Sequence, residues 1–151
     1  MTLQALLDNR VLIACLIAWG LAQVIKLPVE SLRTRRWDWS VLLRAGGMPS
    51  SHSALVSAAA HAIGLTAGFS SPVFAAAAVL AMVVIYDATG IRRQAGRHAE
   101  VINAMVQDLV EGHPLRQEQL REVLGHSPFE ALMGVVLGVC VAQVVITLLR
   151  A

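Results

Sequence analysis

The chain has 151 residues, of which 56% are hydrophobic and only 15% are charged, and its formal net charge is +2. Soluble domains carry about 25% charged residues on average, so we expect one small membrane-embedded domain over residues 1–151. The composition excludes a disordered chain, a coiled coil and a disulfide-rich scaffold, and the small net charge argues against a nucleic-acid partner.

An uncharged run near the N-terminus predicts the first membrane-spanning helix. Val11–Ile25 contains no charged residue, and the helix can extend to Leu27 if the side chain of Lys26 reaches back to the membrane interface. The run is short, because a crossing needs ~20 mostly apolar residues.

A second uncharged run is too long for one crossing and predicts a helical hairpin. Ala45–Tyr86 lacks Asp, Glu, Lys and Arg, and a single helix of that length would measure about 60 Å. The glycine, serines and proline of Gly68–Pro72 mark a turn. We therefore expect two helices, at about 50–68 and 73–88.

The last uncharged run, Ala131–Leu149, predicts a further span. Gly134 and Gly138 form a small contact surface on it, and a homo-oligomer is one way to bury that surface. Apolar residues at helical spacing inside the polar stretch 87–127 predict an amphipathic helix; they are Val101, Ile102, Met105, Val106, Leu109 and Val110. The expected fold is an all-α membrane bundle of about four transmembrane helices plus this interfacial helix.

Basic residues gather in two of the connections between the expected spans. Ten of the twelve are Lys26, Arg33, Arg35, Arg36, Arg44, Arg92, Arg93, Arg97, Arg116 and Arg121. With four spans, both connections lie on the same side of the membrane, and the positive-inside rule makes that side cytoplasmic. We expect a multi-pass protein of the plasma (inner) membrane whose termini and Gly68–Pro72 turn face outward.

The first polar cluster, Gly46–Ser53, has the sequence Gly-Gly-Met-Pro-Ser-Ser-His-Ser. Its glycines and proline predict a tight loop, and its serines and the backbone N–H groups of the following helix can hold an anion. His52 falls in the first turn of that helix. The alternative is a helix cap with an incidental histidine.

The second cluster, Asp87–His98, lies where the third span leaves the bilayer. Its arginines can bind a phosphate through paired hydrogen bonds. They can equally form a solvated flank or contact anionic headgroups. Asp87 is left without a role.

In the third cluster His126 and Glu130 are four residues apart and share a helix face. A carboxylate that holds one ring nitrogen leaves the other free for nucleophilic attack. The alternative is a simple capping pair.

Together the clusters resemble the type 2 phosphatidic acid phosphatase superfamily, which also contains the vanadium haloperoxidases, and in particular its short divergent branch. Pro49–His52 is similar to the superfamily motif Pro-Ser-Gly-His, with Ser51 in place of glycine. His126 through Glu130 is similar to the end of the third motif, His, three residues, Asp, and the superfamily often has glycines four and eight residues further on. The branch is also marked by Tyr-Asp-Ala-x-Gly-Ile-Arg-Arg and Leu-Gly-His-Ser-Pro, which occur here at 86–93 and 124–128.

The chain departs from the superfamily pattern in the first and third motifs. Lys26 and Arg33 have the spacing of the first motif, but Thr34 replaces its proline. Arg121 lies one residue later than the arginine of the third motif. Arg92 has the correct spacing to His98, which makes His98 a rival nucleophile, although Ile102 stands where the acid should follow.

The resemblance implies a hydrolase that removes phosphate from a lipid phosphate or diphosphate through a phosphohistidine, without metal or cofactor. It implies His126 as nucleophile, Glu130 as the group that orients it and His52 as general acid. The implied phosphate ligands are Ser50, Ser51, Arg92, Arg93, Arg121 and Lys26. The substrate can be phosphatidic acid, an isoprenoid phosphate or diphosphate, or phosphatidylglycerol phosphate. The alternatives are a non-enzymatic membrane protein that binds anionic lipid or phosphate as a scaffold or carrier, and haloperoxidase chemistry.

Overall fold

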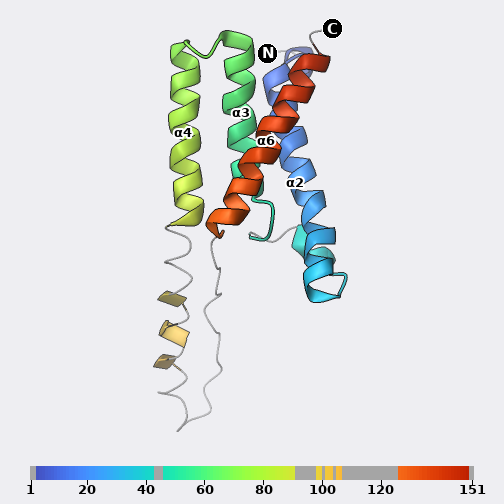
Figure 1. Ribbon diagram of the computed structural model, residues 1–151, viewed down its shortest axis with the longest axis vertical. Helices are drawn as coiled ribbons and strands as arrows, with labels where there is room; N and C mark the ends of the chain where they lie inside the picture. Colours follow the sequence, from blue (N-terminus) through green and yellow to red (C-terminus); the bar gives the residue numbers. More distant parts are fainter. Residues whose placement is uncertain are drawn as a thin grey trace.

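The computed structural model is all-helical, which confirms the expected fold class. The residues it describes are 3–42, 46–90, 98–99, 101–103, 105–106 and 126–149. The named elements are α1 (Leu3–Leu7), α2 (Arg10–Thr34), the 3-10 helix η1 (Trp39–Leu42), α3 (Ser51–Ala67), α4 (Pro72–Thr89) and α6 (Pro128–Leu148). The four long helices stand side by side, with the starts of α3 and α6 and the end of α4 facing the same end of the bundle (Figure 1).

Three helices within the described residues are long and apolar enough to cross a membrane by length and composition, namely α2, α4 and α6. The fourth expected span, α3, has 17 residues and measures about 25 Å, compared with a hydrocarbon core of ~30 Å. It packs against each of the other three helices. The shortest of the four long helices is therefore the central one.

Small residues allow the helices of the bundle to approach closely. Buried alanines from α2, α3 and α6 form the core with Val141 and Ile146. A methyl group at Gly134 would collide with Ser50, the cap of α3, and with Ser53, and one at Gly138 would collide with Ala54 and Ser57. Both glycines thus face α3 of the same chain, so a second copy is not needed to bury them.

The first span is longer than the apolar run predicts. Helix α2 continues through Pro28 to Thr34 and ends where Arg35 adopts a left-handed conformation, with φ of 57°. Lys26 is 1% exposed, so its ammonium group does not reach back to the interface as expected. Its side chain instead points into the bundle, because helix α3 supplies a polar partner there.

The described part of the predicted amphipathic helix is helical at 98–99, 101–103 and 105–106. The apolar side chains of Val101, Ile102, Met105 and Val106 are exposed. Leu109 and Val110 lie outside the described residues. An exposed apolar helix face next to a membrane bundle is the pattern of an interfacial helix.

Candidate functional site

The site is built around the start of α3, where the predicted anion-binding loop lies. Ser50 caps the helix, since its Oγ accepts a hydrogen bond from the backbone N–H of Ser53 at 3.3 Å. The hydroxyl of Ser53 donates to the same oxygen at 3.1 Å. Gly47 has a φ of 80°, which favours glycine, and a Cβ added there would touch the side chain of Lys26. The loop therefore closes over α2 and presents the first turn of α3.

The start of α6 combines the two roles that the sequence left open for Glu130. The Oε2 atom of Glu130 accepts a hydrogen bond from the backbone N–H of Ser127 at 3.1 Å, and Ser127 Oγ accepts one from the backbone N–H of Glu130. This is a capping box. The same Oε2 lies 3.2 Å from Nδ1 of His126. One carboxylate oxygen thus caps the helix and holds the histidine ring.

Backbone hydrogen bonds fix His126 and Ser50 relative to their neighbouring helices. The backbone N–H of His126 donates to the carbonyl oxygen of Ala88, near the end of α4, at 3.0 Å. The backbone N–H of Ser50 donates to the carbonyl oxygen of Glu130, also at 3.0 Å. The start of α6 is thereby tied to α4 on one side and to the cap of α3 on the other.

These contacts bring together two histidines that are distant in the chain. The ring centroids of His52 and His126 are 6.4 Å apart, with an angle of 58° between the ring planes. His126 is 3% exposed. The rings are close enough for both to contact one phosphate group.

Lys26 adds a positive charge to the site from α2. Its Nζ donates to Ser51 Oγ at 3.2 Å, and its charge is attracted by the Glu130 carboxylate. An ammonium group has three donors, and Ser51 is the single hydrogen-bond partner found for it in the part of the chain that the structure describes. A buried ammonium is costly unless its charge and donors are matched. An anion beside Ser51 would supply that match.

The helix dipoles of α3 and α6 also favour binding of an anion beside Ser51 and His126. The positive ends of two helix dipoles, those of α3 and α6, meet here. Chemically, the arrangement brings an oriented imidazole, a second imidazole and a buried cation to the starts of α3 and α6.

The remaining predicted site residues are three arginines and the rival nucleophile His98. Arg92, Arg93 and Arg121 lie outside the described residues. His98, the rival nucleophile, is helical and exposed, whereas His126 is buried beside His52.

One further residue has an environment typical of a functional group. Gln23 lies on α2 three residues before Lys26 and therefore on the same helix face. Its Oε1 atom is buried and has no hydrogen-bond partner among the described residues. The signal available in the sequence was an amide inside an otherwise apolar run, where polar groups are costly.

The comparisons with known proteins agree with the motifs. A family model described as "Divergent PAP2 family" matches residues 7–141, a range that includes both histidines and Lys26. The chain is 40% identical over 150 residues to a protein of Bacillus subtilis (strain 168) described as an uncharacterized membrane protein, YuiD. That alignment covers 92% of this chain and 95% of the relative. No solved structure matches significantly.

Proposed function

Because this chain belongs to the divergent PAP2 family of membrane proteins, we propose that it hydrolyses a lipid phosphate or diphosphate at the bilayer surface. The observation that carries the proposal is the distance of 6.4 Å between the rings of His52 and His126, beside a buried cation. A phosphohistidine mechanism needs two imidazoles on one phosphoryl group, one as nucleophile and one as acid.

In the first step, His126 attacks phosphorus through Nε2. Glu130 accepts a hydrogen bond from the N–H at Nδ1, which leaves the lone pair of Nε2 available. The N–P bond forms as the bond between phosphorus and the lipid oxygen breaks. Protonated His52 gives its proton to that leaving oxygen, so the lipid alcohol departs neutral.

In the second step, water releases the phosphate. His52, now neutral, accepts a proton from the attacking water, and the oxygen of that water bonds to phosphorus as the N–P bond breaks. The products are inorganic phosphate and regenerated His126. Proton transfer of this kind typically contributes ~10²–10⁴-fold to the rate.

The negative charge on the phosphoryl oxygens requires fixed positive groups. Lys26, the hydroxyls of Ser50 and Ser51, and the N–H groups at the start of α3 supply them in this proposal. By resemblance to the family, Arg92, Arg93 and Arg121 complete the set. Charge stabilisation at these oxygens is the main catalytic need of phosphoryl transfer.

We propose that the site faces the cytoplasm in the plasma membrane. The two connections with most of the basic residues lie on the side of the motif loops, and lysine and arginine are retained on the cytoplasmic side. A lipid phosphate can then present its headgroup to the site while its chains stay in the bilayer.

The test is phosphate release by the purified protein from a panel of phosphatidic acid, farnesyl phosphate, farnesyl diphosphate and phosphatidylglycerol phosphate, with and without vanadate. We expect release that vanadate inhibits and that is lost in His126→Ala. His98→Ala is the matched control, because His98 is exposed and we expect it to retain activity.

The alternative function, binding of anionic lipid without hydrolysis, predicts a different result. The parent protein would then retain lipid phosphates but release no phosphate from any of them. Loss of phosphate release in His98→Ala, together with full activity in His126→Ala, would make His98 rather than His126 the nucleophile. A thermal unfolding curve for each variant separates loss of chemistry from loss of fold.

A further inference from the structure

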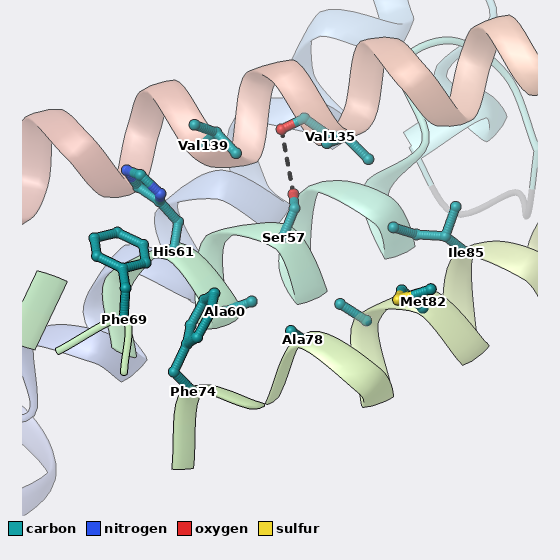
Figure 2. A pocket seen from close by; sticks show the side chains of 11 residues that line it. Ser57, Ala60, His61, Phe69, Phe74, Ala78, Met82, Ile85, Val135 and Val139 are labelled. Atoms are coloured by element: carbon teal, nitrogen blue, oxygen red, sulfur yellow. Dashed lines mark hydrogen bonds between the residues drawn. The ribbon is translucent and has the colours of Figure 1, made fainter. Parts of the chain in front are cut away.

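A groove of about 270 Å³ lies between α3, α4 and α6, and neither His52 nor His126 lines it. Its wall includes Ala60, Phe74, Ala78, Met82, Ile85 and Val139. Figure 2 shows it as an elongated space, with Phe69 and Phe74 near one end and Met82 and Ile85 near the other. The helices that form it include two that can cross a membrane, α4 and α6.

The groove exists because α4 and α6 are held together at one end only. The hydrogen bond from His126 to Ala88 joins the start of α6 to the end of α4. From there α6 crosses in front of α3 and moves away from α4 (Figure 1), and direct contact between α4 and α6 is slight. Alanines at 60, 78 and 81 leave the resulting wedge unfilled.

The polar side chains in the wall already have partners. The hydroxyl of Ser57 lies 2.6 Å from the carbonyl oxygen of Ser53 and 3.3 Å from that of Val135 (Figure 2). The Nε2 atom of His61 lies 3.0 Å from Oε1 of Gln143. The rest of the groove wall consists largely of carbon atoms, which disfavour bound water and favour a hydrocarbon ligand.

One end of the groove also lies close to the site of His52 and His126. Ile85 lines its inner end, and Ala88, whose carbonyl holds the backbone of His126, follows three residues later. Three residues correspond to about 4.5 Å along the helix axis. A molecule whose phosphate lies between His52 and His126 can therefore direct an attached chain along the groove.

The volume of the groove suits a single hydrocarbon chain better than a helix. From Ile85 to Phe74 the groove follows α4 for about 16 Å, and its volume of about 270 Å³ is far less than the roughly 1,200 Å³ that a helix of that length and ~10 Å diameter would fill. The volume is also below the ~300–1,000 Å³ of pockets for drug-sized ligands. A helix from a second copy therefore does not fit, and the carbon lining disfavours a polar headgroup.

We propose that this groove binds one hydrocarbon chain of the lipid phosphate, entering sideways from the bilayer between α4 and α6. The inference rests on the proposed function for its substrate and deepens it, since it makes chain length a determinant of specificity. A long chain, acyl or isoprenyl, would align the phosphate with His126, whereas a short chain would leave the groove empty.

The experiment fills the groove and measures chain-length preference. Ala78→Phe places a ring in the groove from α4, and Ala76→Phe, at an exposed position on the same helix outside the groove, is the matched control. The substrates are dioleoyl and dibutyryl phosphatidic acid for acyl chains, and farnesyl and isopentenyl phosphate for isoprenyl chains. We expect Ala78→Phe to reduce the long-over-short preference in kcat/KM about tenfold, a usual size for pocket discrimination, and Ala76→Phe to leave it unchanged.

A binding measurement separates this inference from the proposed function. In the His126→Ala background, native mass spectrometry gives the fraction of protein that retains each of the same four lipids. Reduced retention of the long-chain lipids in Ala78→Phe supports the groove even if the parent releases no phosphate. Equal preference and equal retention in Ala78→Phe and Ala76→Phe would overturn the inference, as would a change of oligomeric state without a change in chain preference.

Discussion

Glu130 holds His126 through Oε2, which lies 3.2 Å from the Nδ1 atom of the histidine. The same oxygen caps helix α6 through the backbone N–H of Ser127. The orientation of the ring is therefore coupled to the start of the helix. A single side chain fixes both the position and the tautomer that attack on phosphorus would need.

Replacement of this carboxylate should separate orientation from capping. Ser127 still caps α6 in Glu130→Gln, so we expect a stability loss of about 1 kcal/mol or less. The turnover number should fall roughly 10²–10⁴-fold, because the carboxylate no longer selects the tautomer. Phosphate release and thermal unfolding measure the two effects. A Glu130→Gln variant with the turnover of the parent would remove Glu130 from the mechanism.

Lys26 should contribute to anion binding more than to stability. In Lys26→Met an apolar side chain of similar length replaces a buried charge, a change that is often neutral or stabilising. Vanadate affinity should fall about 10–100-fold, since a hydrogen bond to a charged group contributes ~1.5–3 kcal/mol. Vanadate titration and a melting curve test this. Unchanged vanadate affinity would show that the anion lies elsewhere.

The crossing of α3 and α6 should not tolerate a methyl group. In Gly138→Ala the added Cβ would collide with Ser57 and the carbonyl oxygen of Ala54, so we expect a loss of about 1–3 kcal/mol in unfolding free energy. Gly20→Ala is the control, because a Cβ there meets nothing within 4 Å and alanine favours a helix by up to about 1 kcal/mol. Equal stabilities for the two variants would contradict the close contact.

The orientation of the protein can be tested with single cysteines after replacement of Cys15 and Cys140. We expect Ser70→Cys, in the turn between α3 and α4, to react with a membrane-impermeant maleimide in intact cells. Arg36→Cys, just after α2, should react only after lysis, because basic connections stay in the cytoplasm. The reverse pattern would place the histidine site on the outer face.

Parts of the site were readable from local spacing, and parts were not. The four-residue interval between His126 and Glu130 predicts a shared helix face, and the contact is present. The pairing of Lys26 with Ser51 was not predicted as a contact, since it joins two helices and depends on how each is rotated about its axis. Gln23 was missed for the same reason, because an amide in an apolar run can face lipid or protein.

The sequence by itself determined the all-helical membrane character, the turn at Gly68–Pro72 and the residues that belong to the motifs. These properties depend on hydropathy and on turn-forming residues, which act within a few residues of one another. Only the tertiary structure decided that α3 is central, that Gly134 and Gly138 face it and that α4 and α6 leave a groove. In a bilayer the hydrophobic effect does not distinguish lipid-facing from protein-facing apolar surfaces, so close packing and interhelical hydrogen bonds choose which helices meet.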